Sequence, residues 1–358
     1  MTNPPLRYLT ALVCLAGSAL APCAAHAQAP AVPGPPPLAT TPAAPGASAP
    51  PSVATPPVPG TPPTGAPPLA RREPIVLPLP PDIPKDYQLG PDSVPHDGVP
   101  QGRIEGPFLF HSTVLANTTH KYWIYVPQQY NPRKAASVLV FQDGQRAINP
   151  VGVLRVPVVL DNLIAEKDIP VTIGIFVTPG ERGDTYPDSI GLGNPDNRSV
   201  EYDSLGDTYA RFICDEMLPE VGKKYNLSKD PNERAIGGAS SGAIVAFTVA
   251  WERPNEFHKV ISMIGSFTNI RGGDAYPGIV RQSDPKPIKI FIQDGFEDNR
   301  NPDNPARDWH LQNENMVAAL KEKGYDMEYV FGDGPHADNH GGAILPDILR
   351  WMWRDERK

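Results

Sequence analysis

One serine of this chain stands between two glycines, in a context that would make it a nucleophile. The motif Gly238-x-Ser240-x-Gly242 follows a short apolar run and precedes the apolar stretch 243–251, which predicts a strand, a sharp turn and a helix. Small residues beside Ser240 fit such a turn, because the strand and helix backbones pass very close there. The helix N-terminus would favour negative charge developing in front of the serine. An ordinary glycine-rich turn is the alternative interpretation. A matching acid and base elsewhere in the sequence would favour a nucleophilic serine.

The acid that serves such a serine should follow a later strand of the same sheet. The apolar run 288–293 predicts a strand, and three carboxylates come after it: Asp294, Glu297 and Asp298. Asp294 ends the strand directly, where it can cap the following glycine turn through its own backbone. Asp298 lies beyond that turn, at a point from which the loop can return over the sheet edge. We therefore expect Asp298 to be the acid.

The base should be a histidine after the last strand, which the sequence predicts over residues 327–331. His336 directly follows the tight Gly334-Pro335 turn, so we expect it to be the base, whereas His340 would need the loop to fold back. Both assignments stay open, as does a helix-capping loop with two surface histidines. The remaining histidines lie in the expected leader or linker, on early strands or beside other elements: His26, His96, His111, His120, His258 and His310.

The negative charge that forms during attack on an ester needs backbone N–H donors. One donor is the N–H of Ser241, next to the nucleophile, and the other should come from the loop after the predicted strand 137–142. In that loop Gln145 follows an Asp-Gly pair, and glycine lets the backbone turn an amide inward. The side chain of Gln145 is a further candidate donor.

A metal site is a competing interpretation of the histidine loop, because His336, Asp338 and His340 alternate and Asp333 is near. No further cluster of strong ligands supports it. The loop 294–303 is rich in Asp and Asn, but it lacks the ligand spacing of a known calcium loop. We therefore expect no metal and no cofactor.

The first 27 residues read as a secretory signal peptide. Arg7 is the only early charge, residues 8–21 are apolar, and Ala25-His26-Ala27 fits an Ala-x-Ala cleavage site. The apolar stretch is too short to span a bilayer, and no later segment reaches the necessary length of about 18 apolar residues. We expect an exported protein, periplasmic or secreted, without a membrane span. A lipid anchor at Cys23 is the alternative, although Pro22 stands where a small residue is expected.

A proline-rich tract follows this leader. Of the 46 prolines, 27 lie in the first 100 residues, and residues 28–70 contain no charged side chain. Such sequence has too little apolar side chain to form a core, so residues 28–102 should be disordered and residues 103–358 should form one folded domain.

Cys214 is the single cysteine after the leader, so an internal disulfide is not expected. The net charge of −8 offers no basic patch and argues against nucleic acid as a partner.

The order of apolar runs predicts an α/β fold. Two antiparallel strands come first and strands then alternate with helices, which favours a mostly parallel sheet with helices on both faces. Besides the elbow around Ser240, the predicted strands cover residues 108–115, 120–126, 137–142, 171–177, 259–264, 288–293 and 327–331. The predicted helices cover residues 156–166, 209–225, 313–323 and 344–353. Pro219 should kink the second of these helices.

Several segments resemble the putative esterase family, which includes enterochelin (siderophore) esterases, feruloyl esterases and the formylglutathione hydrolase group. They are residues 122–127, 140–144, 237–242, 293–298 and 332–336, and the Arg198-x-x-Glu201-Tyr202 motif. The resemblance covers about residues 106–354 and implies a single α/β-hydrolase domain. It also implies a structural ion pair between Arg198 and Glu201 near the site.

By the same match Ser240, Asp298 and His336 would form a catalytic triad. Residues 143–145 would be the oxyanion loop. Pro335 departs from the family, in which a glycine usually precedes the histidine. The residues that flank the histidine differ as well, so the family's substrate contacts cannot be transferred to this chain.

Together these features predict an exported carboxylic ester hydrolase that works through an acyl-enzyme. Its substrate would be a small-molecule or polysaccharide-linked ester, of the feruloyl type or from a siderophore. Acyl transfer to a sugar is the closest alternative, because it shares the acyl-enzyme step. A catalytically idle envelope or binding protein is the alternative from another class, and the full set of candidate residues argues against it. The sequence does not indicate the oligomeric state.

Overall fold

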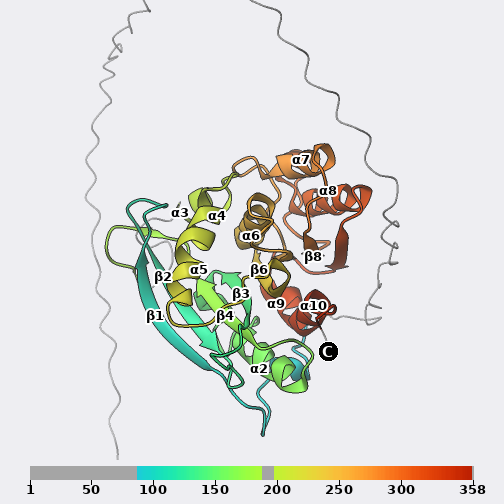
Figure 1. The fold of residues 1–358 in the computed structure, drawn as a ribbon. Helices are drawn as coiled ribbons and strands as arrows, with labels where there is room; N and C mark the ends of the chain where they lie inside the picture. The colour runs from blue at the N-terminus through green and yellow to red at the C-terminus, as the bar shows by residue number, and fades with distance from the viewer. Residues whose placement is uncertain (1–86, 188–196, 357–358) are drawn as a thin grey trace, which may run out of the picture. The chain divides into compact units, whose positions relative to one another are not determined.

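Residues 87–187 and 197–356, which the computed structural model describes, contain nine strands in one sheet (Figure 1). The strand order is β1-β2-β4-β3-β6-β7-β8-β9, and the short β5 pairs with β2. The strands are β1 Arg103–His111, β2 Thr118–Val126, β3 Ser137–Gln142, β4 Thr172–Val177, β5 Glu181–Arg182, β6 Arg234–Ala239, β7 Lys259–Met263, β8 Lys289–Gly295 and β9 Asp326–Gly332. The expected leader, residues 1–27, and the expected linker up to residue 86 lie outside the described residues.

The direction of the strands places one set of loops at a common edge. β1 and β2 are antiparallel and β2 is antiparallel to β4, whereas β4, β3, β6, β7, β8 and β9 are parallel neighbours. The predicted antiparallel pair and mostly parallel sheet are thus confirmed. Since parallel strands end at the same edge, the segments that follow β3, β6, β7, β8 and β9 converge there.

Helices cover both faces of the sheet, as predicted (Figure 1). Side chains alternate along β3: Val138 and Val140 join the apolar cluster under α6 and α8, while Leu139 and Phe141 join the cluster under α2 and α10. The helices are α1 Gly144–Ala147, α2 Val156–Glu166, α3 Asn197–Tyr202, α4 Thr208–Arg211, α5 Leu218–Gly222, α6 Ser241–Glu252, α7 Tyr276–Gln282, α8 Trp309–Glu322, α9 Asp338–Ala343 and α10 Leu345–Met352. The chain therefore has the predicted α/β fold.

The predicted helix over residues 209–225 is interrupted. A π-helical segment, Phe212–Met217, separates α4 from α5. Pro219 has no N–H to donate to the carbonyl four residues earlier, so the regular ladder cannot continue through it. The irregularity expected from Pro219 takes the form of a π segment rather than a simple kink.

Residues 87–102 pack against the domain, although the sequence assigned them to the linker. The ring of Tyr87 stacks on His340 with 4.3 Å between centroids. Asp92 pairs with Arg350 at 2.7 Å, and Asn162 donates to its backbone carbonyl at 2.9 Å. The expected boundary between residues 102 and 103 is therefore too late. The contacts are made by a few isolated side chains with distant partners, which composition does not reveal.

The turn from β6 into α6 brings two backbones into direct contact. A Cβ atom on Gly238 would lie 2.5 Å from the carbonyl oxygen of Gly242, closer than such atoms can approach. Since the obstacle is backbone rather than a flexible side chain, it cannot move aside. Packing therefore requires glycine at position 238, the first glycine of the Gly-x-Ser-x-Gly motif.

We expect Gly238→Ala to lower the free energy of unfolding by about 1–3 kcal/mol, because the added methyl group overpacks this crossing. Gly278→Ala in α7 is the matched control, since a Cβ there has nothing within 4 Å. It should raise the free energy of unfolding by about 0.5 kcal/mol, because alanine loses less chain entropy than glycine. Urea unfolding of both variants checks this. Equal stability of the two variants would show that the crossing tolerates a side chain.

Candidate active site

Ser240 is held in a backbone conformation that side chains rarely adopt. Its φ and ψ angles are 59° and −123°, and its N–H donates to the carbonyl of Met263 at 2.9 Å. Such strain persists only where the surroundings enforce it, and it is common at functional sites. The side chain lies half-buried at the carboxyl edge of the sheet, between the end of β6 and the start of α6.

Three of the predicted side chains form a chain of hydrogen bonds. His336 Nε2 lies 2.8 Å from Ser240 Oγ, and His336 Nδ1 lies 2.6 Å from Asp298 Oδ1. Asp298 is fully buried. Since a carboxylate only accepts, Nδ1 donates to Asp298, which leaves Nε2 to accept the hydroxyl proton of Ser240. The arrangement can remove a proton from Ser240 and return it to a leaving group.

His340, the alternative base, lies apart from this chain of hydrogen bonds. Its ring is buried, stacks on Tyr87, and has Nδ1 3.1 Å from the side-chain nitrogen of Gln293. Because the amide nitrogen is a donor, Nδ1 accepts, so the ring is neutral at this nitrogen. Burial lowers the pKa of His340 to about 4. The structure thus brings His336, and not His340, to Ser240.

The two predicted oxyanion donors belong to the first turns of adjacent helices. Asp143, just before α1, has a left-handed backbone with φ 54°, and Gln145 follows within α1. A Cβ on Gly242 would lie 3.3 Å from the Asp143 carboxylate, so the start of α6 lies against this loop. Neither the N–H of Gln145 nor that of Ser241 has a backbone acceptor within residues 87–187 and 197–356. Both are free to bind an oxyanion.

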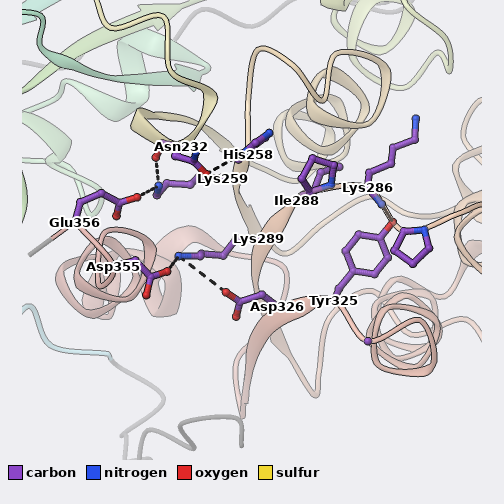
Figure 2. Close-up of a pocket in the computed structure, with 13 residues that line it drawn as sticks. Asn232, His258, Lys259, Lys286, Ile288, Lys289, Tyr325, Asp326, Asp355 and Glu356 are labelled. Atoms are coloured by element: carbon purple, nitrogen blue, oxygen red, sulfur yellow. Dashed lines mark hydrogen bonds and ion pairs between the residues drawn. The ribbon is translucent and has the colours of Figure 1, made fainter. Parts of the chain in front are cut away.

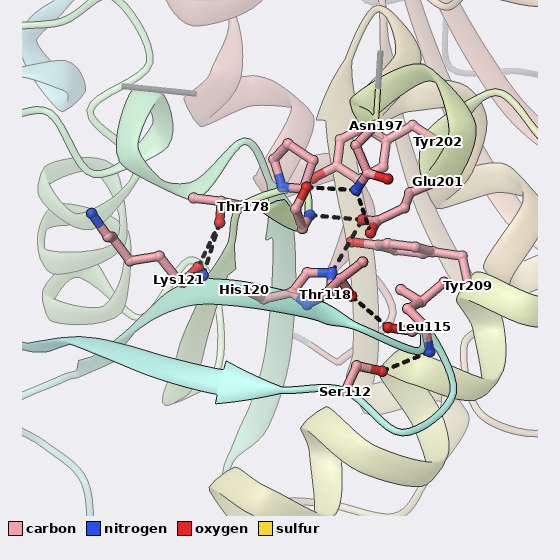
Figure 3. Close-up of polar contacts among 12 residues, drawn as sticks. Ser112, Leu115, Thr118, His120, Lys121, Thr178, Asn197, Glu201, Tyr202 and Tyr209 are labelled. Atoms are coloured by element: carbon pink, nitrogen blue, oxygen red, sulfur yellow. Dashed lines mark hydrogen bonds and ion pairs between the residues drawn. The ribbon is translucent and has the colours of Figure 1, made fainter. Parts of the chain in front are cut away.

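Arg198 and Glu201 do not pair with each other, so this expectation is wrong. Arg198 instead binds both carboxylate oxygens of Asp143, with Nε to Oδ1 at 2.9 Å and Nη2 to Oδ2 at 2.6 Å. Glu201 is buried and accepts from His120 Nε2 at 3.1 Å, the Gly180 N–H at 2.8 Å and the Asn197 amide at 2.8 Å (Figure 3). Each carboxylate finds a complete set of donors elsewhere, which spacing along one helix does not show.

Two further residues touch the site although no motif marks them. Ser266, after β7, has its Oγ 3.1 Å from Ser240 Oγ. Trp309 Nε1, at the start of α8, donates to Ser266 Oγ at 3.0 Å, and its ring meets His336 edge-on with 5.8 Å between centroids. Because the indole donates to Ser266, the Ser266 hydroxyl proton is free to point at Ser240. In the sequence only their positions could have marked these two residues as part of the site: Ser266 follows a strand, and Trp309 begins a helix.

The alternating His336, Asp338 and His340 have separate partners. Asp338 pairs with Arg146, while the two histidines make the contacts described above. In the part of the chain that the structure describes, no group of three His, Cys, Asp or Glu side chains is arranged to hold a metal ion. Nor does any helix within it have the length and apolar character to cross a membrane.

A hollow of about 510 Å³ lies at the opposite edge of the sheet, where β7, β8 and β9 begin (Figure 2). Two of its three lysines have acidic partners: Lys259 Nζ lies 2.6 Å from Glu356 and Lys289 Nζ lies 2.5 Å from Asp355. The third, Lys286, donates to the backbone carbonyl of Trp251 at 2.6 Å. Three carboxylates also line the hollow, so its formal charges balance. The hollow contains none of the predicted site residues.

Comparison with known proteins points to esterases. The family model described as putative esterase matches residues 112–350. The uncharacterized protein YbbA of Bacillus subtilis is 22% identical over 212 residues, which are 59% of this chain and 81% of that protein. An endo-1,4-beta-xylanase/feruloyl esterase of Xylanibacter ruminicola is 25% identical over 181 residues, which are 49% of this chain and 20% of that protein.

Solved structures of esterases share the fold. A ferulic acid esterase superposes with a TM-score of 0.55 at 20% identity, over 71% of this chain and 99% of that chain. The enterobactin esterase FES from Shigella flexneri, solved in the presence of enterobactin, has a TM-score of 0.57 at 17% identity. That match covers 72% of this chain and 61% of the enterobactin esterase. At these identities the likeness concerns the fold.

Burial of His340 should make the protein less stable in acid. Its pKa falls from 6.5 to about 4 on folding, so the unfolded chain binds the proton more readily between these values. The free energy of unfolding should then decrease as the pH falls from 6.5 to about 4, by up to about 3 kcal/mol from this ring alone. In His340→Asn, which keeps an acceptor for Gln293 but cannot titrate, this part of the decrease should be absent. Urea unfolding across this pH range measures it, and identical pH dependence in both proteins would contradict it.

Proposed function

This chain belongs to the putative esterase family and is a carboxylic ester hydrolase, and we propose that it is an exported enzyme that cleaves its substrate through Ser240, His336 and Asp298. The observation that supports this most is the unbroken pair of hydrogen bonds, 2.8 Å from Ser240 to His336 and 2.6 Å from His336 to Asp298. A protein that had lost catalysis would have no reason to keep a strained serine in line with a buried acid.

In the proposed reaction Ser240 Oγ attacks the ester carbonyl carbon while its proton passes to His336 Nε2. Asp298 stabilises the imidazolium that forms. The carbonyl oxygen becomes an oxyanion and accepts hydrogen bonds from the N–H groups of Gln145 and Ser241. When the carbon–oxygen bond to the leaving group breaks, His336 returns the proton to the alcohol, and an acyl-enzyme remains.

The same residues complete hydrolysis in reverse order. A water molecule gives a proton to His336 Nε2 as its oxygen attacks the acyl carbon. Collapse of the second tetrahedral intermediate releases the carboxylic acid and returns the proton to Ser240. A sugar hydroxyl in place of water would give acyl transfer by identical steps. Hydrolysis is preferred here because the related proteins are described as esterases.

We propose as substrate a feruloyl-type ester on a polysaccharide or an ester of a siderophore. The ferulic acid esterase and the enterobactin esterase of the same fold motivate both classes. The proposal of export rests on the signal-like residues 1–27.

Ser240→Ala should abolish hydrolysis of p-nitrophenyl acetate, methyl ferulate and a catecholate siderophore, whichever of them the wild type cleaves. Loss of a triad member costs about 10⁴-fold or more in turnover, because its members act as a unit. The variant should also escape labelling by a fluorophosphonate probe and keep the wild-type melting temperature. Ser283→Ala, in the loop after α7, is the control and should label normally. Persistent labelling of Ser240→Ala would refute Ser240 as nucleophile.

Substitution of the two histidines separates their roles. His336→Ala should be nearly as inactive as Ser240→Ala, because no base remains for the hydroxyl proton. His340→Asn should keep turnover within about tenfold, since His340 acts only through packing next to the site. Steady-state kinetics on the best ester measures both variants. An inactive His340→Asn together with an active His336→Ala would reverse the assignment.

A further inference from the structure

A second buried carboxyl group lies against the acid of the proposed triad. Asp294 ends β8 and Asp298 lies in the loop that follows, and both are completely buried. Each uses one oxygen in a bond to a histidine: Asp298 Oδ1 with His336, and Asp294 Oδ2 with His310 Nδ1 at 2.9 Å. The mechanism above uses only the first of these carboxyl groups.

The other two oxygens of this pair have no ordinary partner. Within the described residues, Asp294 Oδ1 and Asp298 Oδ2 are buried and neither meets an N–H or hydroxyl group. The two carboxyl groups are close neighbours across this turn, in which the Asp298 N–H donates to the Gly295 carbonyl at 3.0 Å. Two ionised carboxylates repel each other and cannot donate, whereas one proton held between them satisfies both orphan oxygens.

The surroundings indicate which carboxyl group holds the proton. Burial, together with the neighbouring Asp298 and Asp308 carboxylates, raises the pKa of Asp294 well above its usual range. Asp298 is the carboxylate that accepts from His336 Nδ1 in the proposed triad, so its oxygens serve as acceptors. The proton therefore belongs on Asp294.

We propose that Asp294 is a neutral carboxylic acid that donates a hydrogen bond from Oδ1 to Asp298 Oδ2 and thereby holds Asp298 in line with His336. This inference rests on the proposed function of Asp298. Asp294 is a positioning residue, since it acts on the reaction only through Asp298. His310 positions it in turn, because its Nδ1–H donates to Oδ2 and leaves Oδ1 directed at Asp298.

Packing fixes His310 in this role. Its ring is buried and lies 5.2 Å from the ring of Phe296 and 5.1 Å from that of Phe331, measured between centroids. The ring cannot rotate freely in such a setting, so the plane of the Asp294 carboxyl group is fixed as well. The line of contacts runs from Ser240 through His336, Asp298 and Asp294 to His310, across the carboxyl edge of the sheet.

Two substitutions distinguish a neutral donor from a required charge. Asp294→Asn keeps a donor for Asp298 and an acceptor for His310, so kcat should stay within about threefold of wild type. Asp294→Ala leaves Asp298 Oδ2 buried without a partner, so kcat should fall by about 10–100-fold with little change in KM, as expected for loss of a hydrogen bond to a charged group. Asp303→Asn, an exposed position in the same loop, is the control and should equal wild type. An Asp294→Asn variant as impaired as Asp294→Ala, or an Asp294→Ala variant equal to wild type, would overturn the proposal.

Infrared spectroscopy tests the proton without relying on turnover. At neutral pH the wild-type protein should show a carboxylic acid C=O band that Asp294→Asn lacks and Asp303→Asn retains. Equal bands in wild type and Asp294→Asn would overturn the proposal even if Asp294→Ala fails to fold. A band that disappears in Asp294→Asn, in a protein that cleaves no ester, would refute the proposed function and leave the protonated pair intact.

Discussion

The site depends on the contact between the backbones of β6 and α6, which the lack of a side chain at Gly238 permits. That contact holds Ser240 at a φ of 59° and leaves its hydroxyl at the sheet edge. A side chain fixed in this way cannot move toward its partners. The proposed base, His336, and the proposed acid, Asp298, must therefore be positioned next to it by the rest of the fold. The parallel arrangement of β6, β8 and β9 does this, because the segments after these strands converge at one edge.

Ion pairs between arginines and two buried carboxylates, Asp143 and Asp338, tie the loops around Ser240 to one another. Asp143, before the proposed oxyanion donor, is bound at both oxygens by Arg198 of α3. Arg146, after that donor, pairs with Asp338, which is two residues beyond His336. The loop around Gln145 and the loop that carries His336 are thus tied by the same short helix, α1. Such pairs add little net stability after desolvation, so their value here lies in fixing geometry.

Local patterns in the sequence were sufficient for the fold and for the order of the proposed triad. Apolar runs of strand length alternate with helical periods, and each candidate follows a strand by a few residues. The sequence could not select among partners that are distant along the chain. Three contacts depend on how the folded helices, strands and loops pack together. They are the pairing of Arg198 with Asp143, the packing of Tyr87 on His340 and the contact of Ser266 with Ser240. Residues 87–102 looked like linker for the same reason.

The positions of His336 and His340 show how packing separates two residues that their spacing along the chain does not. His340 lies inside α9, followed by Gly341 and Gly342. A Cβ on Gly341 would lie 2.7 Å from the sulfur of Met263, so this helix sits directly on the sheet edge and carries His340 into the core. His336 precedes α9 and stays in the loop, where its ring can reach Ser240. Gly341 therefore lets α9 lie on the sheet edge with the ring of His340 in the core, the histidine that the sequence alone leaves open as the alternative base.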